Sequence, residues 1–135
     1  MAKIDVDDKR WPVLRITFPK QFTQAEFDEH MRAVLAHAHR GEHFAIFNDA
    51  LSGGHPNAKQ RRQMTDAFED PFVRRNLVAV AILINSPTLR AIAGIFAAMM
   101  PVLPAAMEHF GPADDFKAFA WLREQLRKRA ERRVA

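Results

Sequence analysis

The chain lacks several residues and motifs on which common protein chemistries depend. Its 135 residues include no cysteine, which excludes disulfides, thiolate nucleophiles and sulfur ligands for zinc. The sequence also contains no glycine-rich nucleotide-binding loop and no metal-ligand motif. We therefore predict that the protein has no metal site and no cofactor, and the missing cysteines fit a cytoplasmic location.

Long apolar segments are absent as well. The longest uncharged stretch covers residues 91–107 and is interrupted by Pro101 and Pro104, whereas a transmembrane helix needs about 20 continuous apolar residues. Residues 1–10 mix charges of both signs and contain no apolar core of a secretory signal. We expect a cytoplasmic protein with no membrane span.

The composition is that of an ordinary globular protein, with 48% hydrophobic and 27% charged residues. The length is typical of one domain, so residues 1–135 are predicted to form a single unit. The net charge of +4 comes from a basic cluster near the C-terminus, which comprises Arg123, Arg127, Lys128, Arg129, Arg132 and Arg133. No nucleic-acid recognition motif accompanies this cluster, and we predict no nucleic-acid binding.

Hydrophobic periodicity predicts strands and helices in alternation. Strands are expected at residues 4–7, 13–18, 43–49, 77–84 and 106–110, the fourth of them a continuous apolar run that is typical of a strand buried on both faces. Helices are expected at residues 24–40, 57–69, 87–100 and 114–133. The first begins with a capping box formed by Thr23 and Glu26, and Gly41 is suited to end it. This order predicts an α/β fold with a mixed sheet of four or five strands and helices mainly on one face.

The segment from residue 77 to residue 126, LVAVAILINSPTLRAIAGIFAAMMPVLPAAMEHFGPADDFKAFAWLREQL, resembles the SpoIIAA-like group of bacterial STAS-related domains. The resemblance implies a STAS/SEC14-like α/β fold. The STAS group carries a phosphorylatable serine in an Asp-Ser-Ser-Gly context at the start of a helix. Asp49 matches the strand-end acid of that motif, but Ser52 comes too early, and His55-Pro56-Asn57 opens the helix here. The resemblance therefore implies the fold without the phosphorylation site.

The loop after the third predicted strand is the candidate binding site. Ligands of open α/β sheets bind at the carboxyl ends of the strands, and the chemistry-bearing residues there are Asp49, Ser52, Gly53, Gly54 and His55. The alternative interpretation is a Gly-Gly turn that leads to a helix capped by Asn57. A nucleophile–base set of Asp49, Ser52 and His55 is a third hypothesis, but such sets are normally assembled from separate loops. We predict no catalytic residue.

Four histidines, His30, His37, His39 and His43, suggest a metal site at first inspection. Metal ligands within a helix are spaced three or four residues apart, and no such pair lies within the predicted helix. We interpret them as solvated histidines near a helix end, where the helix dipole favours positive charge.

The predicted helix at residues 87–100 is apolar on all sides, with one charge at Arg90. A helix of this kind is covered on both sides. The cover is a second subunit in the hypothesis we favour, or an apolar ligand, or the last helix of the same chain. The interface or ligand candidates are Arg90, Ala91, Ile95, Phe96, Ala98, Met99 and Met100.

The last helix is predicted to place one apolar stripe inward, with Trp121 at its border. The stripe comprises Phe116, Phe119, Ala120, Leu122, Arg123 and Leu126. Residues 126–135 carry no apolar stripe, and we expect this basic end to fray.

The favoured function is a non-catalytic protein-interaction or regulatory module that forms a homodimer or binds a partner protein. The alternative is a carrier or sensor of an apolar small molecule or lipid. It requires an apolar cavity of about 300 Å³ or more, lined by Phe96, Met99, Met100 and Phe119. The third hypothesis is a small hydrolase whose active site is the loop at residues 49–55.

Overall fold

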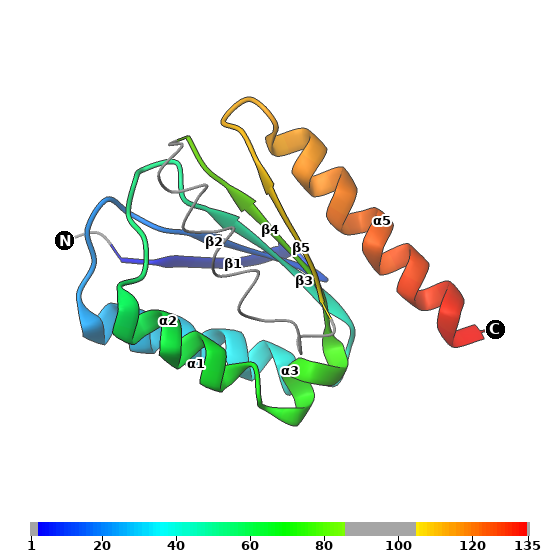
Figure 1. Ribbon diagram of the computed structural model, residues 1–135. Helices are drawn as coiled ribbons and strands as arrows, with labels where there is room; N and C mark the ends of the chain where they lie inside the picture. Colours follow the sequence, from blue (N-terminus) through cyan, green and yellow to red (C-terminus); the bar gives the residue numbers. More distant parts are fainter. Residues whose placement is uncertain (1–2, 86–104, 135) are drawn as a thin grey trace.

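A computed structural model describes residues 3–85 and 105–134 (Figure 1). The strands are β1 (Asp5–Arg10), β2 (Val13–Thr17), β3 (Phe44–Asp49), β4 (Leu77–Leu83) and β5 (Ala106–Phe110). The helices are α1 (Gln24–Ala38), α2 (Ala58–Ala67), α3 (Pro71–Asn76) and α5 (Asp115–Val134). The predicted α/β class is confirmed, and all five predicted strands form. The predicted helix at residues 87–100 lies outside the described residues.

The five strands form one mixed sheet in the order β1-β2-β3-β4-β5. β1 runs antiparallel to β2, and the other three neighbouring pairs are parallel. The register aligns apolar side chains in a row across the sheet, because Leu14 pairs with Ile46, Ile46 with Val80, and Val80 with Met107. These aligned rows provide the surface on which the helices pack.

Three of the four described helices, α1, α2 and α3, lie on one face of the sheet, as predicted, and α5 lies on the other (Figure 1). The crossovers α1 and α2–α3 lie on the same face (Figure 1). Right-handed crossovers between parallel strands placed in sequential order produce this arrangement. α5 follows the last strand and packs on the opposite face, against β3, β4 and β5. The reason is that β3 and β4 are apolar on both faces, and burial of both stabilises the fold.

Each face has its own apolar core. The core under α1 and α3 contains Phe27, Phe44, Leu14, Val73 and Leu77, all almost completely buried. The core under α5 is built around the small side chains of β4 and contains Val13, Ala45, Phe47, Ala79, Ala81, Leu83, Ala118 and Leu122. Small residues in β4 allow the helix backbone to approach the sheet closely.

Local sequence signals fix the helix ends. The predicted capping box is confirmed, since Thr23 Oγ1 accepts from the Glu26 amide at 3.1 Å and Glu26 Oε1 accepts from the Thr23 amide at 2.9 Å. Gly41 adopts a φ of 82° in the turn after α1, a conformation that glycine favours. α3 was not predicted as a helix. Its signal is Asp70-Pro71, an N-cap followed by proline at the first helical position.

The inward face of α5 differs from the predicted one. Ala118 and Leu122 are fully buried, whereas the side chain of Phe116 is 82% exposed. Ala120 and Arg123 are also exposed, so the prediction was wrong for these three residues. The buried residues lie four apart and face the small side chains of β4, where a phenylalanine would not fit as closely. The helix also continues to Val134 and shows no loss of helical structure after Leu126.

No helix among the described residues is both long enough and apolar enough to cross a membrane.

Candidate functional site

A pocket of about 100 Å³ lies between the sheet and the helices α1 and α2. Its floor is formed by side chains near the carboxyl ends of β2, β3 and β4, and residues of the loop after β3 line its rim. Most lining side chains are apolar: Ile16, Phe18, Met31, Val34, Ile46, Ala50, Met64, Phe68, Val80, Ile82, Ile84 and Met107. The carboxyl edge of parallel strands is the usual position of ligand sites in α/β proteins. We call this site the α1–α2 pocket.

Asn48 is a polar residue in the apolar floor of the α1–α2 pocket. The register places it between Ile16 of β2 and Ile82 of β4. Its side chain is half-buried and makes no hydrogen bond to the described residues. The amide is accessible rather than fully buried, because no described side-chain nitrogen or oxygen is both buried and without a hydrogen-bond partner. Its donor and acceptor atoms are therefore available to a bound molecule.

His30 supplies the second polar group from the wall of the pocket. Its side chain is 3% exposed, and its Nδ1 donates a hydrogen bond to the carbonyl of Phe27 at 2.7 Å. The ring also packs edge-on against Phe18 and Phe27. Burial lowers the pKa of His30, so the ring is neutral at pH 7. With Nδ1 as donor, Nε2 is left as a hydrogen-bond acceptor on a ring that lines the pocket.

The rim of the pocket carries basic and backbone groups. The Arg61 guanidinium donates to the carbonyl of Pro56 at 2.9 Å, which holds this side chain against the loop. His55 is exposed, and its Nδ1 lies 3.2 Å from the same carbonyl. Gly54 is buried where a Cβ atom would lie 1.8 Å from the carbonyl oxygen of Pro19. Only glycine therefore allows the loop to pack this closely against the chain after β2.

The five residues predicted as binding candidates in the loop after β3 do not all lie at the pocket. Gly54 and His55 line the pocket, whereas Ser52 is exposed and Gly53 has a φ of 90° in the turn. Asp49 lies on the opposite face of the sheet from the pocket, because successive strand residues point to opposite faces. Its carboxylate accepts from Arg15 at 2.7 Å and from the amide of Leu51 at 3.1 Å.

The arrangement considered for a hydrolase is not assembled. Within residues 3–85 and 105–134, no hydrogen bond joins Asp49, Ser52 and His55 to one another.

Neither polar residue of the α1–α2 pocket, Asn48 or His30, was predicted from the sequence as a pocket residue. For Asn48 the signal was a polar residue at an inward position of the strand, and for His30 it was the helical spacing from Phe27 and Val34.

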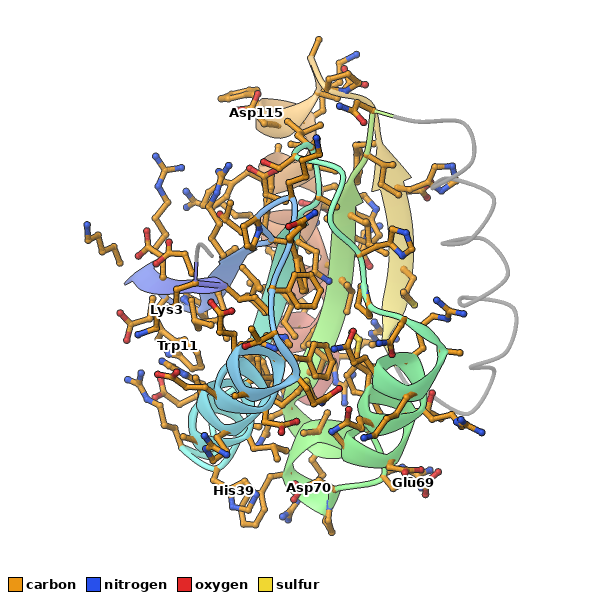
Figure 2. All side chains as sticks on the ribbon, turned by 90° about the vertical axis from the view of Figure 1, so that its left-hand side faces the viewer. Lys3, Trp11, His39, Glu69, Asp70 and Asp115 are labelled. Atoms are coloured by element: carbon orange, nitrogen blue, oxygen red, sulfur yellow. The ribbon has the colours of Figure 1, made fainter. Side chains whose placement is uncertain are left out.

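The histidines of α1 have different environments, and the interpretation as solvated helix-end residues was wrong for His30, which is buried. His37 Nε2 lies 3.2 Å from Asp8 Oδ2, and His39 Nε2 lies 3.0 Å from Asp70 Oδ2. Figure 2 shows His39 and Asp70 together at the end of the molecule opposite Asp115. In the described part of the chain, no group of three His, Cys, Asp or Glu residues is placed to hold a metal ion.

The apolar candidates of the 87–100 segment, Arg90, Ala91, Ile95, Phe96, Ala98, Met99 and Met100, lie outside the described residues. Of the four residues predicted to line a ligand cavity, only Phe119 is described, and it lies on the α5 face, away from the α1–α2 pocket. The pocket is also smaller than the predicted 300 Å³ or so.

Comparisons with protein-family profiles, with curated proteins and with solved structures find no match to this chain. The chemistry of the α1–α2 pocket is therefore the basis for a functional proposal.

Proposed function

We propose that the protein is a non-catalytic binding module that holds one small, mainly apolar molecule in the α1–α2 pocket. The observation that carries this proposal is the half-buried amide of Asn48 in an apolar floor, which makes no hydrogen bond to the described residues, together with the Nε2 acceptor of the His30 ring in the wall. Ligand pockets combine apolar walls with a few polar groups that orient the ligand. A residue that served packing alone at this position would be aliphatic, like its neighbours Ile16 and Ile82.

The size of the pocket limits the ligand. An engineered cavity of about 150 Å³ binds benzene, and the α1–α2 pocket measures about 100 Å³. A single ring or a short branched chain matches this volume better than a long acyl chain. The ligand carries a hydrogen-bonding group, because Asn48 and His30 each offer an unpaired polar atom to it.

The lining residues favour binding over catalysis. None of the described residues around the pocket is Ser, Thr, Asp, Glu or Lys. The usual nucleophiles and carboxylate acid–base groups are thus missing from the described walls. A carrier or sensor role needs no such group.

Native mass spectrometry of the purified protein is the first experiment. We expect an added mass on the order of 100 Da that is lost under denaturing conditions. A second experiment measures thermal shifts with a set of single-ring and short branched compounds, each with and without a hydroxyl or amide group. We expect stabilisation only by the compounds that can form hydrogen bonds.

The variant Asn48→Leu tests the proposed role of the amide. It should change the stability of the free protein by about 0.5 kcal/mol or less, because the amide is not fully buried, and weaken binding about tenfold or more. Gln21→Leu, at an exposed position, is the matched control and should change neither quantity. If no compound binds the wild-type protein, or if Asn48→Leu binds as well as wild type, the proposal is wrong.

Protein interaction is the second candidate function. It is favoured by the all-round apolar pattern of residues 87–100 and by the exposed Phe116 on α5. A homodimer and the SpoIIAA-like assignment remain proposals made from the sequence.

A further inference from the structure

A second concave surface lies on the α5 face of the sheet, opposite the face that carries the α1–α2 pocket. α5 packs against β3, β4 and β5 and leaves the face of β1 and β2 largely uncovered. The resulting groove has a volume of about 670 Å³. Its described lining residues, which define the arginine groove, are Arg10, Trp11, Pro12, Val13, Phe119, Arg123, Leu126 and Arg127.

Two arginines of the groove have no carboxylate partner. The guanidinium carbon of Arg10 lies 5.0 Å from the centroid of the Phe119 ring, and that of Arg123 lies 6.0 Å from it. Within the described residues, neither forms an ion pair, although Arg127 pairs with both Glu124 and Glu131. Arg10 comes from β1 and Arg123 from α5, so the two elements bring two unneutralised charges to one ring. The arginine groove therefore favours a negatively charged binding partner.

The remaining walls of the groove are apolar. Val13, Pro12 and Leu126 line it beside the arginines, and no acidic residue is among its described lining residues. Arginine and apolar groups together are typical of the centre of protein–protein interfaces. A matching occupant carries carboxylates next to an apolar side chain.

Two other occupants fit less well. Single-stranded nucleic acid binds by stacking bases on open aromatic rings. Here Trp11 already stacks on Phe44 with Arg40 over its ring, and Phe119 carries two guanidinium groups. A second copy that used the same groove would bring arginines against arginines, which is unfavourable.

We propose that the arginine groove docks an acidic, partly apolar segment of a partner protein. Its carboxylates pair with Arg10 and Arg123, and its apolar side chain packs against Val13 and Leu126. This interaction is independent of the α1–α2 pocket, which lies on the other face of the sheet.

The test uses a displayed library of random dodecapeptides, selected on the full-length protein. We expect enriched peptides in which Asp or Glu flanks one large apolar residue. Synthetic labelled copies are then titrated with three proteins, the wild type, Arg10→Gln/Arg123→Gln and the control Arg32→Gln/Arg62→Gln. Arg32 and Arg62 are exposed on α1 and α2, so both double variants remove two positive charges.

Affinity should fall about tenfold or more in the groove variant, as expected for the loss of about 1.4 kcal/mol or more, and stay within about twofold of wild type in the control. The proposal is wrong if no acidic peptide is enriched, or if both variants weaken binding equally. It is also wrong if a labelled oligothymidine binds more tightly than the peptides and is released by the groove variant. A concentration-dependent dimer that only the groove variant abolishes would assign the groove to a second copy instead.

Discussion

His39 and Asp70 join the end of α1 to the start of α3, with His39 Nε2 placed 3.0 Å from Asp70 Oδ2 (Figure 2). The other carboxylate oxygen of Asp70 accepts from the amides of Phe72 at 2.9 Å and Val73 at 3.3 Å. The His39 ring also stacks on Phe72, with centroids 4.3 Å apart. One carboxylate therefore caps a short helix and fixes its position against a longer one.

Removal of this carboxylate should destabilise the protein. Asp70→Ala is expected to lose about 1–2 kcal/mol of unfolding free energy, since the N-cap bonds are lost. Asp70→Asn keeps an acceptor for the cap and should lose less. Urea unfolding at pH 7 measures the free energy of unfolding of both variants. Asp66→Ala, a substitution at an exposed position on α2, is the control. Equal losses in Asp70→Ala and Asp66→Ala would contradict the role of the cap.

The Asp70 carboxylate also makes the stability of the protein depend on pH in the acidic range. Burial raises the pKa of Asp70, but hydrogen bonds from His39 and from the amides of Val73 and Phe72 outweigh it, so the folded pKa is below 3.8. Its contribution is therefore complete above pH 3.8 and is lost as the pH falls through the lower folded value. The stability difference between wild type and Asp70→Asn should shrink when the pH is lowered from 5 toward 3.

His30 predicts a second pH dependence, at a higher pH. Burial lowers the pKa of the folded-state ring below the ordinary value of 6.5. At a pH between the folded-state pKa and the unfolded value of 6.5, the unfolded chain binds the proton more readily than the folded protein does. The free energy of unfolding therefore falls as the pH drops below 6.5. The slope contributed by this ring has a maximum of about 1.4 kcal/mol per pH unit.

The measurement is urea unfolding of wild type, His30→Phe and His109→Phe at pH 7.5, 6.5 and 5.5. His30→Phe should show a shallower decline than wild type between pH 6.5 and 5.5. His109→Phe, at an exposed position of β5, should follow wild type. A His30→Phe profile parallel to wild type would show that the ring does not titrate in this range.

The sequence predicted the features that depend on neighbouring residues. The Thr23 capping box and the positive φ of Gly41 follow from short motifs, and both were confirmed. All five strands predicted from hydrophobic periodicity are present, although β1 extends to Arg10 and not to residue 7. The face of α5 could not be predicted, because Phe116 and Ala118 both fit an apolar spacing. The choice between them depends on small side chains of β4, which are distant in the sequence.

The loop predicted as the candidate site lies beside a pocket, but most of the residues that line the pocket were not predicted. The loop after β3 does border a pocket, as its place at the carboxyl end of a strand suggested. Which of Asn48 and Asp49 points into that pocket depends on the pleat of β3 and on the face that α1 covers. Those relationships are set by strand register, and the short motif around Asp49 does not contain them.

Self-association predicted from residues 87–100 can be tested without reference to the pocket. Ile95→Glu places a charge on the expected apolar face, where burial in an interface would be costly. Native mass spectrometry of wild type should give a dimer, and the variant should give a soluble monomer. Arg62→Glu, an exposed position on α2, controls for the added negative charge. An unchanged mass for Ile95→Glu would remove this surface as the dimer contact.

The orientation of α5 gives opposite expectations for two neighbouring residues. Ala118 is fully buried against β4, so Ala118→Leu should overpack this core and cost about 1–3 kcal/mol. Phe116 is 82% exposed, so Phe116→Ser should stay within about 0.5 kcal/mol of wild type. The face predicted from the sequence requires the reverse, because loss of a buried phenylalanine side chain costs about 3–5 kcal/mol. Urea unfolding of the two variants decides between the faces: a large loss in Phe116→Ser together with a neutral Ala118→Leu would mean that α5 is rotated from the orientation described.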